Sequence, residues 1–573
     1  MFNLSYKKNN NSQLFKCLEE NGFSQTQNYV PLYQKFFSIN DNNYNNINLN
    51  HKFKLCNIKK SNNNIFESII CDDKIKKKTN CFFKCSPLID PTKYMIGKYK
   101  NVSKEKVFNL PKFSDNNCQS RLLEPNNVAY IDSFFCYLSS MVYHHHNIHH
   151  CVDFFGSFLC IKKNFKINIA DDIDYLYDST FYHKNKNNLF DVDEIDDNLF
   201  CSDNTRNFRK KLIFNGEIKE ELKIDEPLNY KGVFKELTEK NIIQHNNITS
   251  KNLIFESPKK NNDIIEDTNS HCSSRTSHTS NNDEDYEIED EENESDYSSY
   301  TSDSLTSDIE LNATFNKFPV QIICLEKLEN TLDNLMEIND LSNAEWKSCL
   351  FQIIMNLVIY QKMFDFTHND LHTNNVMYKK TEKQFIWYKL NGIYYKVPTY
   401  GRLFKIIDFG RAIYKFRGVN ICSDSYSSNG DASSQYNCEP FFNKNKPKLE
   451  PNKSFDLCRL ACSLFDFFIE DIEDIDTIKC PIKDIINEWC KDDNGRNILY
   501  KKNGEERYPE FKLYKMIART VHNHIPEEQI KKPLFNIFKT SGKNLKKSWK
   551  SKNLVNIDTL PCYILKNVTE KCN

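Results

Sequence analysis

Two short motifs in the carboxyl half constrain the fold of this chain more than any other feature. HNDLHTNN at 368–375 directly follows a segment from about Ser342 to Phe364 whose apolar residues recur at helical spacing. FKIIDFG at 404–410 is an apolar run that ends in Asp408, with a phenylalanine and a glycine after it. This pattern is typical of a buried strand that enters a tight turn. The sequence therefore predicts a helix followed by a polar loop, and a strand that ends in a carboxylate.

A strongly acidic segment divides the chain. The 573 residues are enough for two ordinary domains or for one domain with insertions. Between Thr276 and Asn316 there are 13 Asp and Glu residues and no Lys or Arg, so the rest of the chain is basic although the net charge is only −1. The segment is also rich in Ser and poor in apolar residues. We therefore expect an insertion over 164–317, with an acidic disordered part over 265–316.

Targeting signals and paired cysteines are not evident in the sequence. The amino terminus, MFNLSYKKNNNSQ, lacks the apolar run of a secretory signal, and the most apolar stretches are too short to cross a bilayer. We therefore expect an intracellular protein that is not secreted, with no membrane partner. The 21 cysteines show neither zinc-site spacing nor a compact disulfide pattern, so most are expected to be free, buried thiols.

The amino half reads as a small β-rich region with one helix. FESIICDD and NCFFKCS predict strands on either side of the basic turn KIKKKT, residues 127–143 have helical periodicity, and CVDFFGSFLCI reads as a pair of strands. VQIICLEKL at 320–328 predicts a further strand beyond the insertion. The carboxyl half is mainly helical, with a hairpin at 385–397 around Asn391-Gly392. The fold class is therefore α+β.

The residues that carry chemistry fit phosphoryl transfer from ATP. That reaction needs a carboxylate beside the incoming hydroxyl, oxygen ligands for Mg²⁺ and a cation on the phosphates. Asp370 and Asn375 have the D-x-x-x-x-N spacing, and Asp408 follows on its own strand. The strand CFFK ends in Lys84, which is the candidate phosphate contact, although a surface lysine is the alternative.

These motifs resemble those of the eukaryotic-type protein-kinase superfamily, and the form HNDLHTNN looks most like the divergent kinases of large DNA viruses. The resemblance covers about 51–163 and 318–530. It implies a bilobal fold, a location in the host-cell cytoplasm or the virion, protein substrates, and no nucleic-acid partner. It divides the chain into an N-terminal extension (1–50), a small lobe (51–163), the last small-lobe strand after the insertion (318–325), a large lobe (326–530) and a basic tail (531–573).

The resemblance also implies roles for individual residues. Asp370 would be the catalytic base, with His368 and His372 beside it, and Asn375 and Asp408 would bind Mg²⁺. Nucleotide contacts would come from Lys84, from its acidic partner on the helix, and from the hinge at Glu326 and Leu328. The partner is either Asp132 or Glu124, and an ordinary helix N-terminal role competes with a loop-holding role for Asp456.

Several positions depart from the family pattern. The sequence has no glycine between Gly22 and Gly97, so NIKKSNNNIF would cover the phosphates with asparagine instead of a glycine-rich loop. Asn369 stands where many kinases have the arginine that receives an activation-loop phosphate, which argues against such control. CEP at 438–440 replaces the usual A-P-E.

Three functions remain open on these residues. The leading one is transfer of the ATP γ-phosphoryl group to Ser or Thr hydroxyls of proteins. A small-molecule phosphotransferase of the aminoglycoside or choline kinase type fits the HxDLHxxN form, and a pseudokinase fits the missing glycine loop. The histidines at 144–150 are interpreted as a solvated turn, and CKDDNGRN at 490–497 as an ordinary loop.

Overall fold

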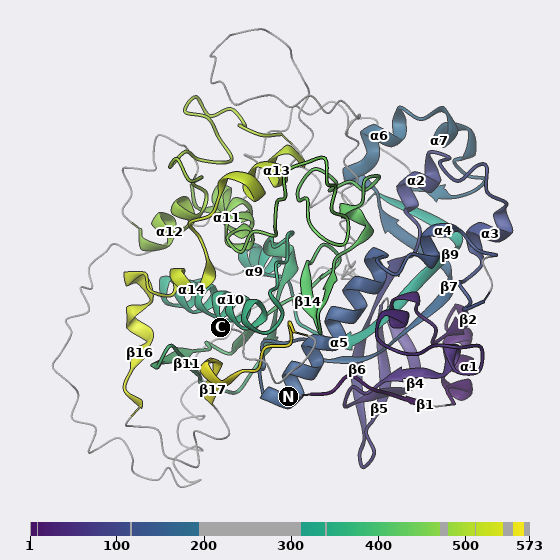
Figure 1. Cartoon of the computed structure of the whole chain (residues 1–573), viewed down its shortest axis with the longest axis horizontal. Coiled ribbons are helices and arrows are strands. Elements are labelled where there is room, and N and C mark those ends of the chain that lie inside the picture. Colours follow the sequence, from purple (N-terminus) through teal and green to yellow (C-terminus); the bar gives the residue numbers. More distant parts are fainter. Residues whose placement is uncertain are drawn as a thin grey trace, which may run out of the picture. The chain divides into compact units, whose positions relative to one another are not determined.

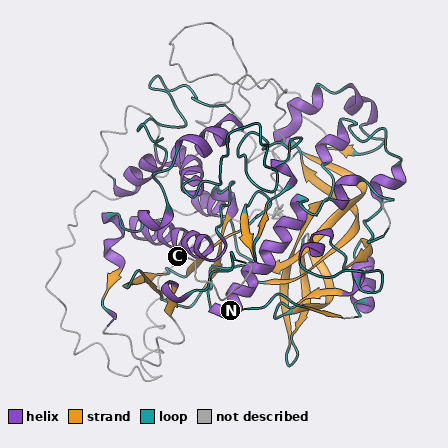
Figure 2. Ribbon diagram, viewed as in Figure 1, coloured by secondary structure: helices purple, strands orange, loops and turns teal. Residues whose placement is uncertain are grey.

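The structure is a computed structural model in which most of the chain outside the insertion is described. The described residues are 2–8, 10–62, 64–114, 117–193, 311–338, 341–469, 480–509, 511–542 and 554–565. The fold is mixed α and β, as the sequence predicts, with a large sheet and a group of helices (Figure 2). The expected acidic disordered segment lies almost entirely outside the described residues.

The largest sheet has seven strands, and every neighbouring pair is antiparallel. The order is β2-β7-β9-β6-β5-β4, with β8 also pairing with β9. The strands are β2 (Phe23–Gln27), β4 (Lys54–Asn62), β5 (Ile65–Cys71), β6 (Lys76–Pro87), β7 (Phe154–Asn168), β8 (Asp191–Val192) and β9 (Asn312–Glu326).

Three features of this sheet differ from the sequence-based expectation. Within the run at 151–161, residues 154–161 belong to one long strand, β7, because the chain forms a bulge near Gly156 (φ 137°) instead of a turn. β9 begins at Asn312, so its first residues were wrongly assigned to the acidic disordered segment. β2 comes from the first 50 residues and pairs with β7, so this part of the chain contributes to the core.

The helix α5 (Val128–His146) packs against β7 and β9 (Figure 1). Asn127 caps its first turn by accepting a hydrogen bond from the backbone N–H of Ala129. All residues from 129 to 142 are buried, which explains why the helix is apolar almost all round.

Shorter elements surround the sheet. From the N-terminal 50 residues come β1 (Tyr6–Lys8), α1 (Ser12–Glu20), η1 (Pro31–Lys35), η2 (Tyr44–Asn46) and β3 (Ile47–Leu49). Between the sheet strands lie α2 (Pro91–Met95), α3 (Lys104–Phe108), α4 (Ser120–Leu123), η3 (Ala170–Asp172), α6 (Ile173–Tyr177) and α7 (Thr180–Asn185).

The carboxyl half is built around α10 (Asn343–Phe364), which is buried over most of its length. Ser342 and Glu345 form a capping box at its start, as the motif SNAE predicts. The other helices are α9 (Leu332–Ile338), α11 (Phe455–Phe468), α12 (Pro481–Trp489), α13 (Phe511–Thr520) and α14 (Pro526–Gln529).

The predicted hairpin is formed by β11 (Phe385–Leu390) and β12 (Ile393–Pro398). Asn391 (φ 51°) and Gly392 (φ 75°) turn the chain between them, which only residues tolerant of positive φ do readily. The last residues extend this hairpin into a four-stranded sheet, in the order β16-β12-β11-β17. The added elements are η10 (Pro533–Phe538), β16 (Lys539–Thr540), β17 (Leu554–Asn556) and η12 (Ile557–Thr559).

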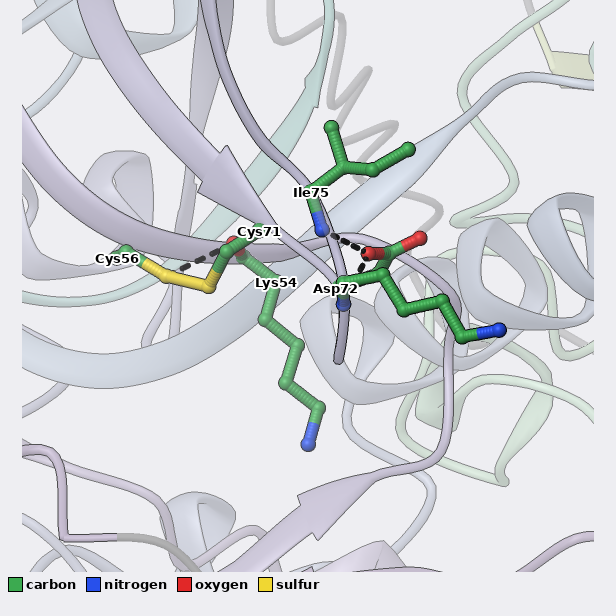
Figure 3. The surroundings of a disulfide bond; sticks show 6 residues. Lys54, Cys56, Cys71, Asp72 and Ile75 are labelled. Atoms are coloured by element: carbon green, nitrogen blue, oxygen red, sulfur yellow. Dashed lines mark hydrogen bonds between the residues drawn. A yellow bond between two sulfur atoms is a disulfide. The ribbon is translucent and has the colours of Figure 1, made fainter.

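Most of the described cysteines are free and buried, as expected, whereas the interpretation of the histidine cluster as a solvated turn was wrong in part. Cys56 and Cys71 form a disulfide between the adjacent strands β4 and β5 (Figure 3). Antiparallel pairing brings their Cα atoms within 6.4 Å, which sequence spacing alone does not reveal. In the histidine cluster, His150 is buried and its ring nitrogens bond the Phe404 carbonyl and the Tyr388 hydroxyl.

Within the described part of the chain, no helix is both long and apolar enough to span a bilayer.

Candidate active site

Hydrogen bonds to a residue of α11 fix the loop that carries HNDLHTNN. The carboxylate of Asp456, in the first turn of that helix, accepts hydrogen bonds from the backbone N–H of His368 (2.9 Å) and of Asn369 (2.9 Å). Asp456 is fully buried, and its burial raises the pKa of the carboxyl although His368 and the two N–H donors oppose that effect. Asp456 therefore fixes the loop directly, and is not merely a helix N-terminal aspartate.

The next two side chains lock the loop against neighbouring segments. A ring nitrogen of His368 lies 2.8 Å from the carbonyl oxygen of Ile407, at the end of β13 (Arg402–Ile406). Asn369 has a positive φ of 61°, donates through its amide to the Arg411 carbonyl, and accepts from the Tyr436 hydroxyl at 2.9 Å. The segment after DFG is thus bonded to the loop through an uncharged amide, where many kinases have arginine.

Asp370 is buried among donors and cations. The Tyr514 hydroxyl, from α13, donates to its Oδ1 at 2.7 Å, and Nε2 of His372 lies 4.0 Å from the same oxygen. Burial raises the pKa of Asp370, but the charges of His372, Arg411 and Arg459 together with the Tyr514 hydrogen bond outweigh it, so the pKa is lowered. Asp370 is therefore held as a carboxylate, which is the form able to accept a proton.

Asn375 ends the loop at η7 (Thr373–Asn375) and faces back toward Asp370. Its amide nitrogen donates to the Asp370 carbonyl oxygen at 2.8 Å and lies 3.1 Å from Nε2 of His372. Its backbone carbonyl accepts from the Ile407 N–H at 3.0 Å, so the loop lies next to the strand that leads to Asp408. The pairing of β10 (Val376–Lys380) with β13 continues this contact.

Asp408 occupies a strained position at the end of the strand. Its φ of 62° is in the left-handed region, which is uncommon for a residue other than glycine. Phe409 anchors the turn, because its ring is buried and its backbone N–H donates to Oδ1 of Asp132 at 2.9 Å. The Asp408 carboxylate remains partly exposed, at 25%.

Lys84, near the end of β6, joins α5 to the Asp408 turn. Its ammonium nitrogen lies 2.8 Å from Oδ2 of Asp132 and 2.9 Å from Oδ1 of Asp408. Of the two acidic partners that the sequence left open, the structure brings Asp132 to Lys84, whereas the Glu124 carboxylate accepts from the Asn126 N–H. Burial raises the pKa of Asp132, but for Asp408 the attraction of Lys84 outweighs burial and lowers the pKa.

The hinge residues are placed differently from the other candidates. The Glu326 carboxylate forms a buried ion pair with Lys405, at 2.5 Å, and a second pair with Lys379, whose side chain is partly exposed. Lys405 and Lys379 oppose the effect of burial, so the pKa of Glu326 is lowered. Leu328 is buried two residues further on. The Glu326 side chain therefore has a structural partner set of its own, and is not brought together with Lys84 and Asp408.

The residues fit a magnesium–nucleotide complex better than a bare metal site. Among the residues described, no three His, Cys, Asp or Glu side chains gather at metal-binding distance. Mg²⁺ in nucleotide enzymes is commonly held by one or two protein oxygen ligands together with phosphate oxygens and water. Asp408, with its lowered pKa and partly exposed carboxylate, would supply one such ligand, and the side chain of Asn375, whose backbone carbonyl accepts from the Ile407 N–H, would supply another.

Several residues around the site were missed by sequence reasoning. Tyr514 contacts Asp370 although 144 residues separate them, and Arg459 donates to the Tyr514 hydroxyl at 3.0 Å. Arg411 pairs with Asp431 after the DFG turn. Only Arg411 had a local signal, its position directly after Gly410; the contacts of Tyr514 and Arg459 depend on how the helices pack.

Comparisons with known proteins support a kinase-like relationship over a short part of the chain. No protein-family model matches it. The serine/threonine-protein kinase haspin of Mus musculus and that of Bos taurus are each 36% identical to it over 83 residues, which is 14% of this chain and 11% of each haspin. A probable serine/threonine-protein kinase of Dictyostelium discoideum is 36% identical over 99 residues, or 16% of this chain and 8% of that protein. The chain is thus similar to serine/threonine protein kinases, and the matches span a small part of those proteins' length.

Proposed function

We propose that this chain is a protein kinase that transfers the γ-phosphoryl group of ATP to Ser or Thr hydroxyls of protein substrates. The proposal is carried by the position of Lys84, whose ammonium contacts both Asp132 on α5 and Asp408 at the DFG turn. The similarity to serine/threonine protein kinases supports the same reaction class. In this proposal the small lobe comprises the seven-stranded sheet with α5, including β2 and the whole of β9, and the large lobe follows β9 to about 530.

The proposed mechanism assigns proton transfer to Asp370. Its carboxylate accepts the proton of the substrate hydroxyl as the hydroxyl oxygen bonds to the γ-phosphorus, and ADP leaves with the electron pair of the broken P–O bond. Lys84 would contact the α- and β-phosphates. Asn375 and Asp408 would hold Mg²⁺, which neutralises phosphate charge when bound.

A second candidate is phosphoryl transfer to a small alcohol. It is favoured by His372, which replaces the usual lysine and whose Nε2 lies 4.0 Å from Asp370 and 3.1 Å from the Asn375 amide. This histidine would occupy the acceptor side of the base, where a small substrate hydroxyl would also have to bind. The two candidates share the chemistry at phosphorus and differ only in the acceptor.

A transfer assay with two acceptor panels tests the proposal. The full chain is incubated with γ-labelled ATP and Mg²⁺, once with a panel of proteins and once with a panel of small alcohols. We expect label on protein Ser or Thr, and Asp370→Asn should reduce it about 10²- to 10⁴-fold. The matched control is Asp73→Asn, because that side chain is 87% exposed and pairs only at the surface with Lys7.

Other outcomes of the same assay reject the proposal in different ways. Label on small alcohols alone supports the second candidate. If neither panel is labelled, but ATP with Mg²⁺ raises the unfolding temperature, the chain is a nucleotide-binding module without turnover. Equal transfer by Asp370→Asn and by the control would remove Asp370 from the mechanism.

A further inference from the structure

A cavity separate from the candidate active site lies at the edge of the large sheet. Its volume is about 280 Å³, and it is enclosed by α1, β3, the start of β4 and the first residues of β7. The Cys56–Cys71 disulfide forms part of the wall, close to Lys54 (Figure 3). The described lining residues include none of those assigned above to catalysis or nucleotide binding.

Two polar groups in the lining are buried without well-aligned hydrogen bonds. His51 is 7% exposed, and among the described residues neither of its ring nitrogens makes a hydrogen bond of good geometry, although the backbone at Leu49 and Phe155 lies close enough to raise its pKa. The amide nitrogen of Asn48 is buried and unpaired within the described part of the chain, although its oxygen accepts from the Asn11 amide at 2.7 Å. Buried polar groups are nearly always hydrogen-bonded, so the Asn48 amide nitrogen and the poorly aligned His51 ring favour a polar ligand in this cavity.

The chemistry of these groups limits the class of ligand that the cavity can bind. Burial lowers the pKa of His51 to about 4, so at neutral pH the ring carries one N–H donor and one bare acceptor nitrogen. Lys54 adds a half-buried ammonium, and burial lowers its pKa, an effect that an anion placed beside it would oppose. The described lining contains no Asp or Glu. It therefore matches an anion that also carries a hydroxyl donor.

The remaining wall is apolar. Phe154, Phe155, Phe158 and Leu55 line the cavity and are buried. An apolar cavity of about 150 Å³ takes up benzene. This cavity has nearly twice that volume, which is enough for a benzene-sized group with a carboxylate and a hydroxyl attached.

We propose that this cavity binds a small hydroxycarboxylic acid with an apolar body. Asn48 and Lys54 would bond the carboxylate, His51 would bond the hydroxyl, and the phenylalanine side chains would enclose the apolar body. Asn10 and Gln13 are exposed at the edge of the cavity, so a ligand would enter between them. The inference does not depend on the proposed kinase activity.

Fluorine NMR with three matched probes tests the proposal on the full chain. 4-Fluoromandelate carries all three groups, 4-fluorophenylacetate lacks the hydroxyl, and 4-fluoromandelamide lacks the negative charge. We expect saturable broadening of the 4-fluoromandelate signal with a dissociation constant of about 1 mM or lower. Each of the other probes should bind about tenfold more weakly, because it leaves a buried group of the cavity unpaired.

Variants connect that binding to the named residues. His51→Phe keeps the ring and removes its nitrogens, so it should weaken 4-fluoromandelate about tenfold and leave 4-fluorophenylacetate unchanged. His183→Phe is the matched control, because that histidine is exposed and far from the lining in sequence. The proposal is overturned if wild-type chain binds none of the probes, if it binds the amide or the phenylacetate as well as the hydroxy acid, or if His51→Phe behaves like the control.

Discussion

Replacing Lys84 with methionine tests the ion-pair arrangement independently of any enzyme assay. Methionine keeps the length and apolar stem of the side chain but removes the ammonium that lies within 3 Å of both Asp132 and Asp408. Removing one partner of a buried pair usually costs about 3–5 kcal/mol. Because the Asp408 carboxylate is 25% exposed and can be partly solvated, we expect the free energy of unfolding to fall by about 2–4 kcal/mol at neutral pH.

The pH dependence of this loss has a definite sign. The pKa of Asp132 is raised in the folded protein by burial, and Lys84 opposes that effect, so removing Lys84 raises it further. A carboxyl whose folded pKa exceeds its unfolded value stabilises the fold below the unfolded pKa and loses that contribution as the pH rises through the folded pKa. The deficit of Lys84→Met relative to wild type should therefore be smaller at about pH 5 than at about pH 7.

Urea unfolding followed by circular dichroism measures the effect at both pH values. The double variant Lys84→Met/Asp132→Asn should recover most of the lost stability, because it removes the unpaired charge, but should not recover phosphoryl transfer. Lys7→Met is the matched control, since Lys7 pairs with Asp73 at the surface, where such pairs contribute little. Unfolding of Lys84→Met at the wild-type urea concentration, at both pH values, would refute the buried ion pair.

Three further substitutions probe the loop and its supports. Asp456→Ala leaves the buried N–H groups of His368 and Asn369 without their acceptor, so it should lower the free energy of unfolding by about 2–4 kcal/mol and abolish transfer, as measured by urea unfolding and by the labelling assay. Tyr514→Phe removes a donor that lowers the pKa of Asp370, so the acidic limb of the pH–rate profile should move to higher pH; an unchanged limb would show that this bond does not tune the base. Ser342→Ala breaks the capping box and should cost about 1 kcal/mol in unfolding free energy while transfer by the folded protein stays at the wild-type level.

Local sequence signals correctly predicted those helices and turns that depend only on residues close together in the sequence. The long helix after Ser342, the hairpin at Asn391-Gly392 and the helix after Asn127 are all found where the sequence placed them. Each depends on a cap, a turn pair or a periodicity that nearby residues complete. The run at 151–161 failed because a strand buried on both faces has no alternation, and a bulge at Gly156 looks like a turn in sequence.

For the candidate site, motif spacing predicted the segments that carry Asp370, Asn375 and Asp408. It did not predict which residues surround them. The roles of these residues in transfer stay predictions until the assays are done. Which acid pairs with Lys84 could not be read from the chain, because Asp132 and Glu124 are both close to the start of the same helix. The Tyr514 bond to Asp370 and the Cys56–Cys71 disulfide were equally hidden.

By itself, the sequence determined the helix after Asn127, the long helix after Ser342 with the polar loop that follows it, the hairpin at Asn391-Gly392, and the carboxylate at the end of a buried strand. Only the tertiary structure decided which charges face one another, that the first 50 residues complete the large sheet, and that His51 and Asn48 line a cavity. The physical reason is the separation in sequence between the residues that interact. Caps, turns and periodicity are set by residues a few positions apart, whereas ion pairs, disulfides and cavities depend on how distant segments pack, and no local pattern encodes that packing.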